Sequence, residues 1–331
     1  MTDKYLPQTA PIGDAVLKIL NVVYRTSLPL LLEGPTGIGK SQIVELFTKQ
    51  EDLDLVILDL SLLEPPDLIG LPVIENNRTR YATPASLPQS GKGILMLEEL
   101  NRAETPVMQP ALQLLSARRL NDYILPEGWL CVAAINPEDE DYLVNVLDPA
   151  LRSRFMQLRV TAETASWLKW AEDNAVHPVI LDIVRFNPDV FATASPRSWD
   201  YASRVISELT ADELADENLL LSVLCGYLPF PWAVHVGQCL NKEVSPVKVD
   251  LETLIDRENG IQQFAEKIEA LEAEGRSDVV IHIAKQIQDL FEQNPEHTST
   301  IPQVYFEELL SVLPGDLREQ CLAALGRTLL A

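Results

Sequence analysis

The sequence predicts an α/β protein: an αβα sandwich around a mainly parallel five-stranded sheet, followed by an all-helical part. Two observations predict this fold class. In the first half of the chain, short apolar runs alternate with amphipathic stretches, which is typical of buried parallel strands joined by helices. After about residue 160 the apolar runs give way to helical periodicity. The 331 residues are also enough for two domains.

Each predicted strand is a short apolar run, and helices fit between the runs. Between the second and third strands, polarity alternates around the turn-forming pair Asn76 and Asn77, so we expect an inserted hairpin at residues 73–83. A second hairpin or sharp turn fits residues 120–128. The predicted strands are residues 28–33, 55–60, 93–98, 129–136 and 155–160, with helices at 14–24, 40–49 and 106–118.

The predicted domains are an α/β domain at residues 1–160, a helical domain at 161–245 and a helical extension at 246–331. Residues 218–241 contain no Asp, Glu, Lys or Arg and are long enough to cross a membrane. Gly226, Pro229 and Pro231 interrupt this segment. We therefore expect two short buried helices joined by a proline-containing turn, and no membrane span.

Composition argues against several classes of partner. The net charge is −23, from 49 acidic and 26 basic residues, and such a surface repels nucleic acid. The first residues lack the basic-then-apolar order of a secretory signal, so we expect a cytoplasmic protein. The four cysteines lie far apart without a Cys-x-x-Cys pair, which predicts reduced, buried thiols and neither disulfides nor a zinc site.

A glycine-rich octet follows the first predicted strand and opens a helix. It matches the Gly-x-x-x-x-Gly-Lys-Ser phosphate loop (Walker A) in its required context. Its glycines let main-chain N–H groups point at phosphate oxygens, and the helix N-terminus adds positive potential. Lys40 would contact the β- and γ-phosphates of ATP, and the Ser41 hydroxyl would coordinate Mg²⁺. The octet is Gly34, Pro35, Thr36, Gly37, Ile38, Gly39, Lys40 and Ser41.

A pair of glutamates ends the apolar run at residues 94–97. A phosphate loop needs a group near Mg²⁺ and a base for water, normally two adjacent acids after a neighbouring strand (Walker B). Glu98 would hold Mg²⁺ through water, and Glu99 would act as the general base.

These motifs resemble the AAA+ ATPases, and within them the MoxR-like group. The resemblance covers roughly residues 14–209 and rests on three features: Glu98-Glu-Leu-Asn-Arg-Ala103, the inserted hairpin before it, and Leu147-Asp-Pro-Ala-Leu-Arg-Ser-Arg-Phe155. The family has Asp where this chain has Glu98, and the extra methylene puts Mg²⁺ affinity and turnover in question.

The resemblance implies roles for further residues. Asn136 matches the sensor-1 residue that aligns the attacking water, although the sequence alone would make it a turn-forming Asn before Pro137. Arg154 matches the arginine finger offered to a neighbouring subunit's ATP, with Arg152 as the competing candidate and a solvated surface arginine as the alternative for either. Arg197 resembles the sensor-2 arginine of the helical lid.

The resemblance also implies a homo-oligomeric ring, a hexamer, that hydrolyses ATP to remodel or activate a client protein. Such proteins often act with a separately encoded von Willebrand factor A domain partner and assist metal or cofactor insertion. One alternative is a nucleic-acid-linked motor of the restriction-system type, for which Arg78, Arg80, Arg118 and Arg119 would have to form a basic channel. Another is a nucleotide-gated scaffold that hydrolyses ATP weakly.

Overall fold

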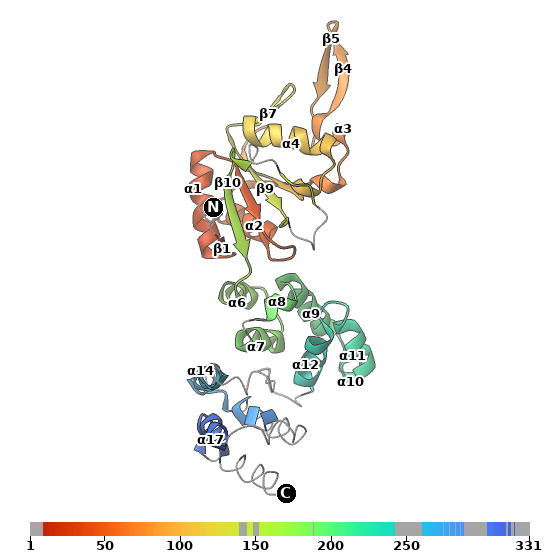
Figure 1. Ribbon diagram of the computed structural model, residues 1–331. Helices are drawn as coiled ribbons and strands as arrows, with labels where there is room; N and C mark the ends of the chain where they lie inside the picture. Colours follow the sequence, from red (N-terminus) through yellow and green to blue (C-terminus); the bar gives the residue numbers. More distant parts are fainter. Residues whose placement is uncertain are drawn as a thin grey trace. The chain divides into compact units, whose positions relative to one another are not determined.

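The computed structural model describes residues 9–138, 144–147, 152–187 and 189–241, together with most of 260–287 and 303–321. The chain divides into two compact units (Figure 1). The first unit contains Met1–Trp167 and Ser195–Arg197, and the second contains Leu168–Ala194 and Ser198–Ala331. The predicted boundary near residue 245 lies outside the described residues and stays a prediction.

The first unit is built on a parallel sheet of six strands in the order β1-β10-β2-β9-β6-β3. The α/β prediction is confirmed, but the predicted strand number was one too low. The missed strand, β1, has only three residues and ends in proline, too short to give an apolar pattern. The strands are β1 (Thr9–Pro11), β2 (Leu30–Glu33), β3 (Asp54–Asp59), β6 (Lys92–Glu98), β9 (Gly128–Ile135) and β10 (Met156–Thr161).

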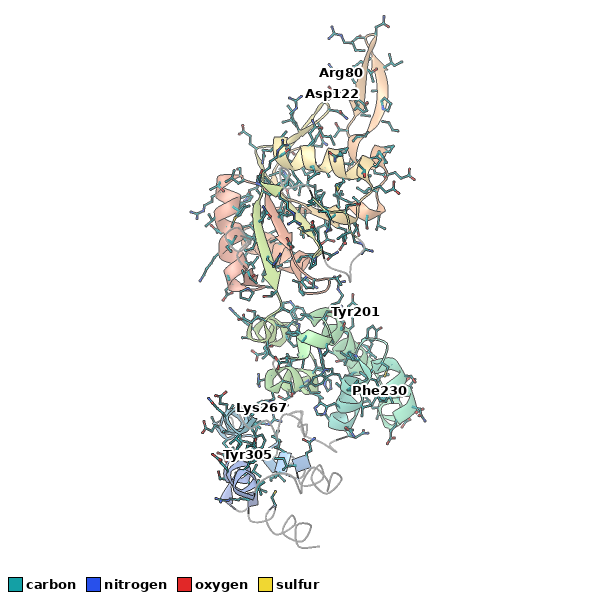
Figure 2. The ribbon with its side chains drawn as sticks, viewed as in Figure 1. Arg80, Asp122, Tyr201, Phe230, Lys267 and Tyr305 are labelled. Atoms are coloured by element: carbon teal, nitrogen blue, oxygen red, sulfur yellow. The ribbon has the colours of Figure 1, made fainter. Side chains whose placement is uncertain are left out.

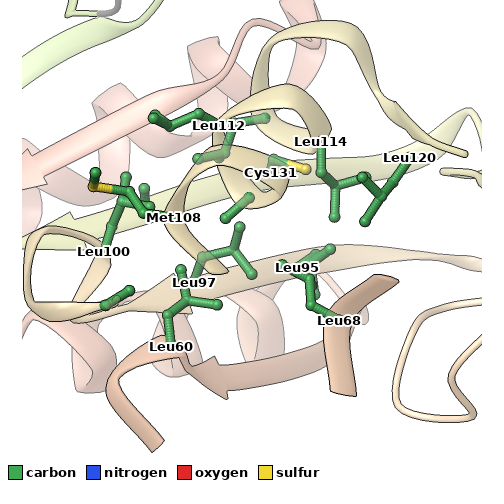
Figure 3. Close-up of a cluster of buried hydrophobic side chains, with 14 of the residues drawn as sticks. Leu60, Leu68, Leu95, Leu97, Leu100, Met108, Leu112, Leu114, Leu120 and Cys131 are labelled. Atoms are coloured by element: carbon green, nitrogen blue, oxygen red, sulfur yellow. The ribbon is translucent and has the colours of Figure 1, made fainter. Parts of the chain in front are cut away.

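Both faces of the sheet are covered by a buried apolar cluster, and successive side chains along a strand point to opposite faces. Leu95 and Leu97 of β6 belong to one hydrophobic cluster, whereas Ile94 and Met96 belong to another. Helices α3 (Pro65–Ile69) and α4 (Thr105–Ala117) complete the first cluster, shown in Figure 3. Helices α1 (Asp14–Thr26) and α2 (Lys40–Gln50) complete the second. The result is a three-layer αβα sandwich.

Two hairpins extend from this unit. Strands β4 (Leu71–Glu75) and β5 (Arg78–Ala82) are joined at Asn76 and Asn77, whose φ angles of 52° and 56° suit the tight turn of a two-residue hairpin. Strands β7 (Arg119–Leu120) and β8 (Tyr123–Ile124) form the second hairpin. The main-chain N–H of Tyr81 donates to Asp122 Oδ2 at 3.1 Å, so the hairpins touch (Figure 2).

The second unit is helical in its described residues. Gly226 and Pro229 lie between helices α11 (Glu217–Leu224) and α12 (Phe230–Leu240), so the segment without charged side chains forms two short helices, as predicted. None of the described helices is long and apolar enough to cross a bilayer. The other helices are α6 (Thr164–Asp173), α7 (Pro178–Phe186), α8 (Val190–Thr193), α9 (Pro196–Glu208), α10 (Ala211–Ala215), α14 (Gly260–Ala273) and α17 (Gln303–Ser311), of which α6 and α9 begin in the first unit.

The cysteine prediction was correct for three of the four thiols. Cys131, Cys239 and Cys321 are free and buried, and burial raises the pKa of Cys131 and of Cys239 to about 12. Cys225 is exposed. It follows the last residue of α11, where the apolar run continues in sequence but the chain turns toward solvent.

Candidate nucleotide-binding site

Three neighbouring strands bring the predicted phosphate-binding and acidic residues to one edge of the sheet. Strand β9 lies between β2 and β6, and all three are parallel, so their carboxyl ends meet. The phosphate loop follows β2, Glu98 ends β6, and Asn136 directly follows β9. In an open α/β sheet this edge is where ligands bind.

The phosphate loop has the curled backbone that its glycines predict. Gly37 and Gly39 have φ angles of 75° and 103°, in the left-handed region that favours glycine. Space is also limiting, because a Cβ atom at Gly37 would lie 2.7 Å from Ser195 Oγ. Helix α2 starts at Lys40 with Gly39 as its N-cap, so the helix N-terminus faces the loop.

The Lys40 ammonium group donates three hydrogen bonds. Its Nζ lies 2.6 Å from the Gly34 carbonyl oxygen, 2.9 Å from that of Pro35 and 3.2 Å from Asn136 Oδ1. Burial lowers the pKa of Lys40 to about 8; Glu99 and Glu98 oppose this shift, and Arg197 adds to it. The lysine is therefore held at the loop by weak neutral acceptors, which phosphate oxygens could replace.

Ser41 and Glu98 lie in direct contact, with the Ser41 hydroxyl donating to Glu98 Oε1. Among the residues that the structure describes, no three His, Cys, Asp or Glu side chains are grouped so that they could hold a metal ion. Mg²⁺ does not need such a group, because it is commonly held by one or two protein oxygens, water and substrate phosphates. The Ser41 hydroxyl and the Glu98 carboxylate fit that arrangement.

Glu99 has an unusual backbone and two side-chain partners. Its φ angle of 54° is left-handed, which is strained for a residue with a side chain. Its Oε2 accepts a hydrogen bond of 2.7 Å from Asn136 Nδ2 and lies 3.5 Å from Arg102 Nη1. The Asn136 amide thus links Lys40 on one side to Glu99 on the other.

Asn101 is a functional candidate that the sequence reasoning did not single out. It is fully buried in the short helix η3 (Leu100–Arg102). Its Nδ2 donates to the Asn136 carbonyl at 2.9 Å, and its Oδ1 accepts from the Asn136 N–H at 3.3 Å. The available signal was an uncharged polar residue inside the motif at residues 98–103, but its partner could not be read from the sequence.

The two finger candidates have different surroundings. The Arg152 guanidinium forms ion pairs with Glu33 and Glu138, whereas Arg154 is exposed and makes no hydrogen bond or ion pair within the described residues. Glu33 also pairs with Arg159 at 2.9 Å. Neither glutamate is predicted as a site residue from the sequence, since nothing local distinguishes them from surface acids.

Arg197 lies in the first turn of α9, and residues 195–197 cluster with the first unit. Its main-chain N–H donates to the Gly37 carbonyl at 3.0 Å, and its charge contributes to the lowered pKa of Lys40. The structure therefore brings together the phosphate loop, Glu98, Glu99, Asn136 and Arg197. Arg152 and Arg154 are not among the contacts of this group.

Comparison with known proteins gives a family match and several similar proteins. Residues 29–155 match the AAA domain of the dynein-related subfamily. The chain is 33% identical over 159 residues to the "Putative chaperone BssE" of Thauera aromatica, covering 44% of this chain and 55% of that protein. It is 27% identical over 152 residues to the denitrification regulatory protein NirQ of Pseudomonas aeruginosa, covering 43% and 58%. The matches thus span about half the length of these relatives.

A solved structure, the RuvB Holliday junction branch migration motor of Thermotoga maritima, matches with a TM-score of 0.42 and 14% identity, covering 78% of this chain and 82% of that one. The parallel sheet, its phosphate loop and the AAA domain match thus give residues 29–155 the fold of an AAA+ P-loop domain. Within that class, the motif at residues 98–103 is similar to the MoxR-like signature.

Proposed function

We propose that this protein is an ATPase that hydrolyses MgATP at the interface between subunits of a ring. The observation that carries the proposal is the hydrogen-bonded chain from Lys40 through Asn136 to Glu99, at the carboxyl edge of the sheet. It joins a phosphate-binding cation to a carboxylate base through one amide.

Each residue of that chain has a step to perform. Lys40 exchanges the Gly34 and Pro35 carbonyl oxygens for β- and γ-phosphate oxygens, which are stronger acceptors because they are charged. Glu99 accepts the proton of the attacking water, and the Asn136 amide orients that water. Ser41 and Glu98 would hold Mg²⁺, which supplies charge neutralisation on the phosphate oxygens when bound.

Charge develops on the transferred phosphoryl group, and a further guanidinium beside Arg197 would stabilise it. A planar, permanently charged guanidinium suits this need. Arg154 is exposed and uncommitted within the described residues, so it is the candidate offered to a neighbour. Activity would then depend on assembly, and a hexamer is the ring that the MoxR-like group implies.

We further propose that hydrolysis drives remodelling or activation of a client protein in the cytoplasm. Loss of γ-phosphate contacts would release the lid, because Arg197 lies in the first turn of α9. One relative is named as a chaperone and another as a denitrification regulatory protein, which supports a role in acting on other proteins. A von Willebrand factor A domain protein as partner, and metal or cofactor insertion as the outcome, complete the proposal.

The nucleic-acid motor has weaker support. Arg118 donates to the carbonyl oxygens of Trp129 and Pro126, so it stabilises its own loop rather than a basic channel. Arg80 pairs with Glu75 on the same hairpin. The scaffold alternative rests on Glu98 in place of the family's Asp, and a turnover measurement decides it.

The test combines binding, turnover and subunit mixing. We expect the purified protein to bind and hydrolyse MgATP, Lys40→Ala to abolish binding, and a mixture of Lys40→Ala with Arg154→Ala subunits to recover partial hydrolysis. Lys40→Ala subunits would supply the finger, and Arg154→Ala subunits the nucleotide. Absence of recovery in mixtures shown to co-assemble would exclude a finger acting between subunits. ATP binding without turnover would favour the scaffold.

A further inference from the structure

Four charged side chains form a closed cluster next to the phosphate loop: Glu33, Glu138, Arg152 and Arg159. Glu33 ends β2 immediately before Gly34 and is only 5% exposed. Its Oε2 lies 3.0 Å from Arg152 Nη1, and its Oε1 lies 2.9 Å from Arg159 Nη2. The second terminal nitrogen of Arg152 donates to Glu138 Oε1. Two carboxylates thus balance two guanidinium groups.

The cluster fixes Arg152 and leaves Arg154 free to project. Arg152 is the first residue of a turn. Its carbonyl oxygen accepts hydrogen bonds from the Phe155 N–H at 3.2 Å and from Gln157 Nε2 at 3.0 Å. Phe155 is buried in the hydrophobic cluster that includes Leu97. The turn is therefore anchored on both sides of Arg154, by an ion pair at one end and an apolar side chain at the other.

The members of the cluster lie close in sequence to three proposed functional segments. Glu33 precedes the phosphate loop, Glu138 lies two residues after Asn136, and Arg152 lies two residues before Arg154. Glu138 Oε1 also accepts from the Leu147 N–H at 3.2 Å. Burial alone lowers the pKa of Arg152, but its hydrogen bonds and charge interactions with Glu138 and Glu33 outweigh that effect and raise it. The guanidinium is thus held as a cation by partners in its own chain.

We propose that Glu33 and Arg152 are positioning residues for the arginine finger. Their ion pair holds the turn at residues 152–155, so the finger that a subunit offers is tied to that subunit's own phosphate loop. Arg152 is an anchor rather than a finger, because its guanidinium is already bound by two carboxylates. This inference rests on the proposed ring ATPase, and it assigns the finger to Arg154.

Subunit mixing tests the proposal with Glu33→Gln. Alone, this variant should bind a fluorescent ATP analogue as the wild type does, and hydrolysis should fall by about 10- to 100-fold, the scale on which a displaced group loses effect. Mixed with Lys40→Ala subunits, it should recover hydrolysis, because it supplies the nucleotide and its neighbour supplies an intact turn. Mixed with Arg154→Ala subunits, it should not recover, because neither subunit then offers a positioned finger.

The opposite pattern, recovery with Arg154→Ala and none with Lys40→Ala, would mean that Glu33 serves its own phosphate loop, and would overturn the proposal. The Lys40→Ala and Arg154→Ala mixture is the reference. If this reference mixture co-assembles but does not recover hydrolysis, the proposed ring ATPase is overturned, and this inference with it. If the reference mixture recovers hydrolysis but the Glu33→Gln mixtures do not show the expected pattern, only this inference is overturned.

Two further variants keep the test decisive if Glu33→Gln does not fold. Arg152→Lys keeps a cation for Glu33 but loses the planar fork, so an anchor should retain most hydrolysis, while Arg154→Lys should lose it. Equal losses in both would make Arg152 a finger and overturn the assignment. Arg152→Gln removes the anchor and should lower hydrolysis as Glu33→Gln does. Arg159→Gln is its matched control, since it removes the other partner of Glu33 without changing the turn, and it should lower hydrolysis less. Equal losses in Arg152→Gln and Arg159→Gln would overturn the proposal.

Discussion

The nucleotide edge of the sheet and the two hairpins differ in which side chains they bury and which they expose. At the nucleotide edge, Asn101 and Asn136 are almost completely buried, and both use their side-chain amides in hydrogen bonds. On the hairpins, Ile74 is 85% exposed and Ile124 is 73% exposed. Polar groups are buried where positions must be fixed, and apolar groups are exposed where the sandwich does not need them. Within this unit, the positions of polar side chains are fixed at the nucleotide edge, whereas apolar side chains are accessible to solvent on the hairpins.

The largest expected effect is on the rate of hydrolysis when the proposed general base, Glu99, is replaced. Glu99→Gln should keep MgATP binding and lower hydrolysis by about 10²- to 10⁴-fold, because the amide cannot accept a proton from water. Single-turnover measurements with radiolabelled ATP separate binding from hydrolysis. Arg102→Gln, which removes the more distant partner of Glu99, is the control. Hydrolysis by Glu99→Gln at the wild-type rate would remove Glu99 from its proposed role.

The next effect is at the buried amide pair. Asn101→Ala should lower the free energy of unfolding by about 1–3 kcal/mol, because it leaves the main-chain groups of Asn136 buried without partners. It should also lower kcat more than it raises KM, since Asn136 would no longer be fixed beside Glu99. Asn145→Ala is a suitable control, because Asn145 donates to the Ala103 carbonyl and not to Asn136. A change in stability alone would make Asn101 purely structural.

A smaller effect is expected in the protonation of Lys40. Its pKa is about 8 without nucleotide, and phosphate oxygens raise it by favouring the charged form. ATP binding at pH 8 should therefore take up about half a proton, and ATP affinity should fall as pH rises through 8. Calorimetry in buffers of different ionisation enthalpy measures this uptake. In Lys40→Arg the side chain stays charged, so any binding that remains should show no uptake from this position.

The smallest effect is expected on the hairpins. Ile74→Ser should change the free energy of unfolding by no more than about 0.5 kcal/mol, because the side chain is already in water. Leu97→Ala, the contrasting variant in the core, should cost about 2–5 kcal/mol. Chemical denaturation compares the two. Equal losses would mean that the hairpin is packed in solution, and the contrast between the two regions would disappear.

Much of the fold can be predicted from local patterns, because apolar runs and glycine-rich turns are recognisable from a few neighbouring residues. The phosphate loop, the acidic pair and the turn at Asn76 belong to this class. The short strand β1 does not, since its three residues become a strand only by pairing with β10. The partners of Asn101 and Arg152 were equally out of reach, because Asn136 and Glu33 lie 35 and 119 residues away.

Strand order accounts for a property of the site that no single residue explains. Because β9 runs between β2 and β6, one carboxamide touches both the ammonium group of Lys40 and the carboxylate of Glu99. A ligand that moves Lys40 away from Asn136 leaves the amide oxygen without that donor. Because the same amide donates to Glu99, ligand binding at Lys40 should change the surroundings of the proposed general base before hydrolysis begins. A substitution that moves the Asn136 amide should therefore disturb the positions of Lys40 and Glu99 together.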